Sequence, residues 1–151
     1  MLAVLALAAA VAAGVVAVRS ALEAPASDVK PTRTTLTSRS VSFGSASVAV
    51  QVLPSGAVCY TVREPTGRAH SCRAKVGVNE IGYAVSPRGI GGVAGPNVSA
   101  VIVKLTRRGT RWATLEDGVF YADVPVAYRV RAILKVLRDG TRKRFSVTPS
   151  S

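Results

Sequence analysis

VSAVIVKLTRRGTRWATLEDGVFYADV, residues 98–124, is the stretch that decides the fold class. It contains three apolar runs separated by two glycine dipeptides, Arg108-Gly109 and Asp117-Gly118. A glycine dipeptide between apolar runs is the strongest short-range signal of a β-hairpin, because the turn needs a residue at positive φ. The stretch therefore predicts three consecutive antiparallel strands joined by two tight turns.

These turns also predict which residues face each other across the strands. A two-residue turn at Asp117-Gly118 places Leu115 opposite Phe120, and one at Arg108-Gly109 places Ile102 opposite Leu115. The other face of these strands is apolar as well, and a sheet with two apolar faces is usually covered on both. We therefore expect the meander to lie inside a small β fold.

A second hairpin determines the relation between the two cysteines. The runs 57–63 and 68–76 flank the sequence EPTG, in which Pro65 excludes the primed two-residue turns because its φ is fixed near −65°. A three-residue turn would put Cys59 and Cys72 on opposite faces of the hairpin. A four-residue loop instead places them directly opposite each other, near the separation that a disulfide requires.

We predict the second register and a Cys59–Cys72 disulfide, which implies an oxidising compartment. Two buried free thiols are the alternative. A zinc site is disfavoured because the chain offers no second pair of ligands, and we expect neither a metal nor another cofactor.

The rest of the chain adds further short strands. Val41–Leu53 alternates between polar and apolar residues, and Glu80–Ser86 is another short strand. Pro87–Pro96, PRGIGGVAGP, is predicted to be a glycine-rich loop, with a short bulged strand as the alternative. Its GIGGVA matches a dinucleotide-binding fingerprint, but no helix follows, so nucleotide binding is rejected. About eight short strands predict an all-β domain over residues 41–151, either a small antiparallel β-sandwich or an open barrel.

The last predicted hairpin carries a candidate binding face. The runs 128–137 and 141–147 flank Asp139-Gly140, and a two-residue turn there places Leu134 opposite Phe145 in the core. The opposite face then holds four basic residues, which are Arg129, Arg131, Lys135 and Arg144. Burying these cations without anionic partners would be costly. We therefore predict an exposed basic face that is a candidate contact for an anionic surface, with a plain solvated face as the alternative.

The overall charge agrees with that prediction. The chain has 20 Lys and Arg against 8 Asp and Glu, a formal net charge of +12. Such a balance favours attraction to anionic lipid, cell-wall polymer or nucleic acid, of which nucleic acid is the least favoured. A protein partner is not identified by the sequence.

The N-terminal segment indicates how the domain is held. Leu2–Val18 is an unbroken run of apolar and glycine residues, at the lower length limit for a helix that spans a bilayer. No basic residue precedes it, unlike in a signal peptide. We predict a membrane helix or uncleaved signal-anchor over residues 1–19, a linker over residues 20–40 and an extracytoplasmic domain. Cleavage of a signal near residues 24–26, followed by secretion, is the alternative.

Residues that could carry catalysis are few. The single histidine, His70, is next to Ser71, but no carboxylate close in sequence would orient it as in a catalytic triad. The acidic residues are scattered rather than paired. We predict that the protein is not an enzyme, and a hydrolase using His70 and Ser71 is kept as an alternative.

A resemblance supports the same location. The pattern G-P-N-V-x-x-V-x-V, followed by T-L-x-D-G-V-F-Y-A-D-V-P and a terminal D-G-T hairpin, resembles small exported or membrane-anchored β domains of unknown function from high-GC Gram-positive bacteria. It covers about half of the chain and implies a fold and a location, with no functional residues to carry over. The expected function is that of a membrane-tethered extracytoplasmic module that binds or scaffolds. The alternative is a binder of anionic polymer or lipid.

Overall fold

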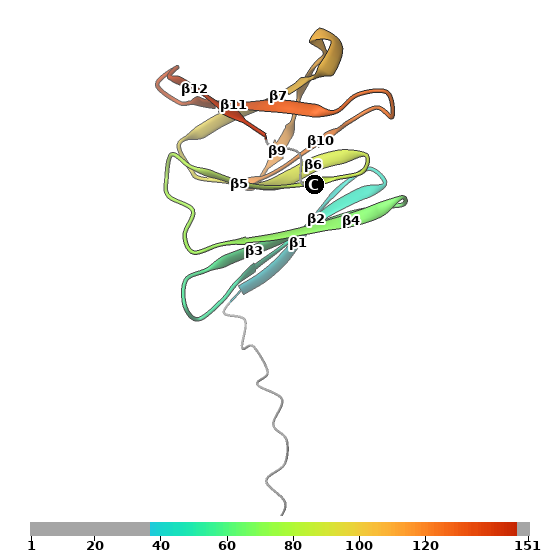
Figure 1. Ribbon diagram of the computed structural model, residues 1–151. Coiled ribbons are helices and arrows are strands. Elements are labelled where there is room, and N and C mark those ends of the chain that lie inside the picture. Colours follow the sequence, from blue (N-terminus) through green and yellow to red (C-terminus); the bar gives the residue numbers. More distant parts are fainter. Residues whose placement is uncertain (1–36, 148–151) are drawn as a thin grey trace, which may run out of the picture. The chain divides into compact units, whose positions relative to one another are not determined.

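The computed structural model describes residues 37–147, which fold into three antiparallel sheets of four strands each (Figure 1). Sheet A contains β1 (Thr37–Phe43), β2 (Ala46–Val52), β3 (Val58–Glu64) and β4 (Gly67–Arg73), in that order. Sheet B contains, in spatial order, β5 (Ile81–Ser86), β6 (Gly89–Ala94), β10 (Val119–Asp123) and β9 (Thr114–Glu116). Sheet C contains β12 (Arg142–Ser146), β11 (Val130–Leu137), β7 (Val98–Leu105) and β8 (Thr110–Trp112). The all-β prediction is confirmed, with three sheets instead of two.

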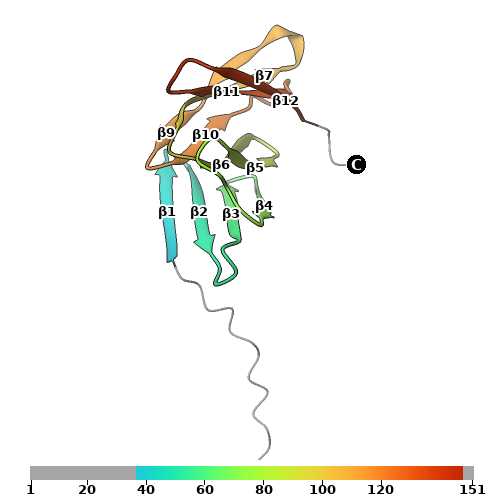
Figure 2. The ribbon, with the colours of Figure 1, turned by 90° about the vertical axis from the view of Figure 1, so that its left-hand side faces the viewer.

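Sheet B is the middle layer of the stack (Figures 1 and 2). One hydrophobic core lies between sheets B and C and includes Ile90 and Phe120, both completely buried. A second core lies between sheets A and B, where Val119 packs with Val48 and Val62. Alternate residues of β10 therefore pack in the two different cores, so sheet B is apolar on both of its faces.

Glycines allow the outer layers to approach sheet B closely. A Cβ atom on Gly82 would lie 2.7 Å from Cε1 of Tyr60 in sheet A, and one on Gly91 would lie 2.8 Å from Cγ2 of Val48. A Cβ atom on Gly92 would collide with the carbonyl oxygen of Gly82 on the neighbouring strand. The segment expected to be a glycine-rich loop is therefore β6, a buried strand of the middle sheet, as in the alternative interpretation.

The predicted meander is correct at one turn and wrong at the other. Asp117 and Gly118 both have positive φ, 49° and 71°, and Leu115 pairs with Phe120 as predicted. Ile102, however, pairs with Trp112 instead of Leu115. A 3-10 helix, η1 (Thr106–Arg108), lengthens the connection that was expected to be a two-residue turn.

The chain also changes sheets within the meander. The run expected to form one strand divides at Ala113 into β8, which pairs with β7 in sheet C, and β9, which pairs with β10 in sheet B. Similarly, the strand expected over Val41–Leu53 is two strands, β1 and β2, joined by a turn at Gly44-Ser45. Strand β1 begins at Thr37, inside the segment that was predicted to be linker.

The C-terminal hairpin differs from its prediction by one residue. Gly140 has a φ of 85°, and Leu137 N donates to Thr141 O at 2.8 Å, so three residues form the turn instead of two. Phe145 consequently pairs with Ile133, and Arg144 pairs with Leu134. A shift of one residue moves a side chain to the other face of a strand.

The predicted membrane segment, residues 1–19, lies outside the described residues. Among residues 37–147 there is no helix with the length and apolar character needed to span a bilayer.

The close packing of β6 leads to a stability prediction. Gly92→Ala should lower the free energy of unfolding by about 2–3 kcal/mol, because the added methyl group meets backbone that can move only with its strand. Gly77→Ala is the control, since its methyl group would meet only the side chain of Glu80. Urea unfolding monitored by circular dichroism measures both, and equal stabilities of the two variants would contradict this role of β6.

Candidate functional site

The outer face of sheet A carries the predicted disulfide. Cys59 and Cys72 pair across β3 and β4 and are bonded, with an S–S distance of 2.11 Å and a Cα–Cα distance of 4.0 Å. The predicted register is confirmed, and the strands continue to a tighter turn at Pro65-Thr66. Cys59 is buried, whereas Cys72 is exposed on the edge strand β4.

His70 belongs to the same surface as the disulfide. Its Nδ1 lies 2.8 Å from Thr61 Oγ1, and its Nε2 lies 3.3 Å from Cys72 Sγ. Successive residues of a strand point to opposite faces, and Ser71 is paired with Tyr60 of the A–B core. The structure therefore does not bring His70 and Ser71 together as the hydrolase alternative requires.

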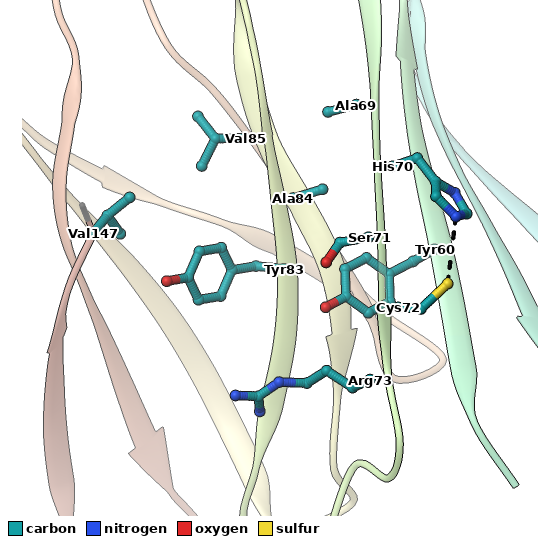
Figure 3. A pocket seen from close by; sticks show the side chains of 10 residues that line it. All are labelled: Tyr60, Ala69, His70, Ser71, Cys72, Arg73, Tyr83, Ala84, Val85 and Val147. Atoms are coloured by element: carbon teal, nitrogen blue, oxygen red, sulfur yellow. Dashed lines mark hydrogen bonds between the residues drawn. The ribbon is translucent and has the colours of Figure 1, made fainter. Parts of the chain in front are cut away.

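An open groove of about 430 Å³ lies between the edge strands β4 and β5 (Figure 3). Ser71, Tyr60 and Tyr83 line it, and Val147 reaches it from the end of sheet C. The Arg73 guanidinium is held at this groove because its Nη1 donates to the carbonyl oxygen of Ile81 at 2.8 Å. The lining residues include hydroxyl groups and one guanidinium group but no carboxylate, which leaves the groove without the paired acids of an acid–base site.

Glu64 forms a polar cluster that the sequence analysis did not identify. Its Oε1 accepts hydrogen bonds from Ser86 Oγ at 2.6 Å and Tyr121 OH at 3.0 Å, and its Oε2 accepts one from Arg88 N at 3.1 Å. Burial, together with the hydrogen bond to Glu64, raises the pKa of Tyr121 well above its usual value. The cluster joins the tip of the β3–β4 hairpin to sheet B. No local sequence pattern indicates this cluster, because the partners of Glu64 are distant in the sequence.

The four residues of the predicted basic face do not share one exposed surface. Arg129, Arg131 and Arg144 are exposed, but Lys135 is only 5% exposed, so the prediction is wrong for Lys135. The pairing of β11 with β7 accounts for the burial of Lys135, which lies opposite Val101 on the face that packs in the core. The three-residue turn places Arg144 opposite Leu134, on the outer face.

The buried lysine has polar and aromatic partners. Lys135 Nζ donates to the Asn79 carbonyl oxygen and lies 5.1 Å from the centre of the Phe145 ring. Burial, and then the nearby charge of Lys143, lowers the pKa of Lys135. Lys135 is therefore part of the packing between the sheets and is not available to a surface ligand.

Sheet C nevertheless carries most of the positive charge. Residues 37–147 contain 17 Lys and Arg and 6 Asp and Glu. Sheet C with its turns and the residue before β11 accounts for one acid, Asp139, and for eleven basic residues, which are Lys104, Arg107, Arg108, Arg111, Arg129, Arg131, Lys135, Arg138, Arg142, Lys143 and Arg144. Nine of these eleven are exposed. The cationic surface is thus an entire outer layer instead of one hairpin.

The outer face of sheet C combines apolar and basic side chains. The register aligns Trp112, Ile102, Leu134 and Arg144 in one row across its four strands. Trp112 is the only tryptophan of the chain, and its side chain is 66% exposed, although tryptophan side chains are usually buried. Lys104 and Arg142 lie on the same face in the two neighbouring rows. Ile102 itself is buried. We call the surface defined by Lys104, Trp112, Leu134, Arg142 and Arg144 the sheet C face.

Comparison with known proteins adds no relative to this description: no protein-family model, curated protein or solved structure matches the chain.

The Glu64 cluster yields a prediction for stability. Glu64→Ala should lower the free energy of unfolding by about 2 kcal/mol, because it leaves the Tyr121 hydroxyl without its acceptor and leaves the buried Ser86 hydroxyl with the Gly89 carbonyl oxygen alone. Glu116→Ala removes an exposed carboxylate from a hairpin of sheet B and should change stability by less than about 0.5 kcal/mol. Thermal unfolding of both variants measures the difference, and similar melting temperatures would show that the cluster does not stabilise the fold.

Proposed function

We propose that this protein is a membrane-tethered, extracytoplasmic, non-catalytic module that binds an anionic polymer through the sheet C face. The observation that carries the proposal is the segregation of charge, with eleven of the seventeen basic residues of the described range 37–147 in one outer layer that holds a single acid. Such a layer attracts anions over a distance and raises their local concentration at the surface.

The side chains of this face suit a polymer in which phosphate groups alternate with short carbon units. The guanidinium groups of Arg142 and Arg144 can each bind a phosphate through two parallel hydrogen bonds. The exposed ring of Trp112 offers a flat apolar surface against which the carbon units between the phosphates can pack. Together these residues provide contacts for both the charged and the uncharged parts of a repeating unit.

The order of the layers favours a polymer over a lipid bilayer. Whatever precedes Thr37 joins the domain at sheet A, and sheet B lies between sheet A and the sheet C face (Figure 2). A domain tethered at sheet A therefore has its basic layer on the far side from its attachment. A cell-wall polymer can reach that side of the domain.

The disulfide supports the proposed location. A bridge between two facing strands persists in oxidising compartments and is rare in the cytosol. Export agrees with the predicted N-terminal membrane segment, for which secretion after signal cleavage is the alternative.

Binding to a glycerol-phosphate polymer tests the proposal. Arg142→Gln with Arg144→Gln should weaken binding of the full chain about tenfold at low salt and should make binding less dependent on salt concentration, because two phosphate contacts are lost. Arg63→Gln with Arg68→Gln is a control with the same net charge, since both residues are exposed on the outer face of sheet A. Isothermal titration calorimetry at several salt concentrations measures each affinity.

The control variant is expected to bind within about twofold of the unmodified protein, because charges on the distant sheet are partly screened. An equal loss of affinity in both variants would show attraction by net charge alone and would contradict a specific face. Vesicles with phosphatidylglycerol form the second arm of the experiment. If they bind more tightly than the polymer and depend on Arg142 and Arg144, the partner is a bilayer and the polymer proposal fails.

A further inference from the structure

Three metal-ligating side chains meet on the outer face of sheet A, opposite the layer that carries the proposed binding face. Cys59, His70 and Cys72 each offer one ligand atom, and these atoms all lie within 4.8 Å of one another. The cysteines face each other across β3 and β4, and His70 is two residues before Cys72 on the same face of β4.

The spacing of these atoms approaches that of a zinc site. Zinc–nitrogen distances of about 2.0 Å and zinc–sulfur distances of about 2.3 Å in a tetrahedron place the nitrogen and sulfur atoms about 3.5 Å apart. His70 Nε2 and Cys72 Sγ are 3.3 Å apart. Of the required separations, the one that must change most is between the two sulfur atoms, which are joined in the disulfide.

Thr61 would hold the histidine in the appropriate state. In the tautomer that leaves Nε2 free for a metal ion, Nδ1–H donates to Thr61 Oγ1, 2.8 Å away. Metal-binding histidines almost always use their second nitrogen in this way, which fixes the ring orientation. Thr61 is thus a positioning residue for His70.

We propose that reduction of the Cys59–Cys72 bridge converts this surface into a zinc site with Cys59, Cys72 and His70 as its three protein ligands. A dithiol reductant supplies two electrons and two protons, which break the S–S bond and leave two thiols, while the reductant becomes a disulfide. Zn²⁺ then displaces the two thiol protons, and a water molecule takes the fourth ligand position.

The accessibility of the site suits both steps. Cys72 is exposed on an edge strand, so a reductant can reach its sulfur atom, whereas Cys59 is buried. In the oxidised protein His70 is the sole ligand of the three that can bind a metal ion. The redox state of the bridge therefore switches zinc binding on and off, independently of the proposed polymer binding on sheet C.

Cobalt binding to the full chain in detergent, after anaerobic reduction and removal of the reductant, tests the proposal. The reduced protein should bind one Co²⁺ per chain. Its spectrum should show the visible absorption of tetrahedral cobalt and a thiolate-to-cobalt charge-transfer band. Addition of Zn²⁺ should displace the cobalt. The oxidised protein should show neither feature. His70→Ala should weaken binding at least a hundredfold, and Thr61→Val should weaken it about tenfold to a hundredfold.

Ser71→Ala is the matched control, because Ser71 lies between His70 and Cys72 in the sequence but on the opposite face of β4. The affinity of this variant for Co²⁺ should equal that of the unmodified protein. If reduction unfolds the protein, Zn²⁺ should restore the circular dichroism spectrum of the folded state. Equal affinities of the reduced protein and its His70→Ala variant would overturn the proposal. Absence of the charge-transfer band, or of any recovery of structure with Zn²⁺, would overturn it as well.

Discussion

The absence of side chains at the glycines of β5 and β6 is the constraint on which the three-layer structure depends. Sheet B is covered on both faces, and Tyr60 and Val48 of sheet A approach its backbone at Gly82 and Gly91 to distances that a Cβ atom would not permit. A buried glycine loses more backbone freedom on folding than other residues do. The two hydrophobic cores that form on either side of the sheet offset this cost.

Because both faces of sheet B are used for packing, the outer faces of sheets A and C are the broad surfaces left for ligands. These two surfaces differ in chemistry. Sheet C combines basic side chains with the exposed Trp112, whereas sheet A carries the disulfide, His70 and Thr61. The Glu64 cluster ties the tip of the β3–β4 hairpin to sheet B, so the two surfaces are held on one framework. Binding at one surface therefore need not disturb the other.

Several features could be predicted from the sequence because local chemistry determines them. Alternation identified most of the strands, Asp117-Gly118 determined its hairpin, and the loop beside Pro65 placed the cysteines opposite each other. Other features depend on distant contacts. The turn after Leu137 is one residue longer than expected, which places Arg144 opposite Leu134, and the pairing of β11 with β7 places Lys135 on the core face. Strand β6 has too few side chains to show a pattern, and the change of sheet at Ala113 depends on partners that the local sequence does not reveal.

The central claim is that the sheet C face is the binding surface, and the single tryptophan of the chain allows a direct measurement of it. In a ¹H–¹⁵N NMR titration of the full chain with a glycerol-phosphate polymer, the indole resonance of Trp112 and the backbone amides of β7, β8, β11 and β12 should shift together with one affinity. The backbone amide resonances of sheet A should not shift. Shifts confined to sheet A, or a Trp112 resonance that does not move at saturating polymer, would contradict the claim.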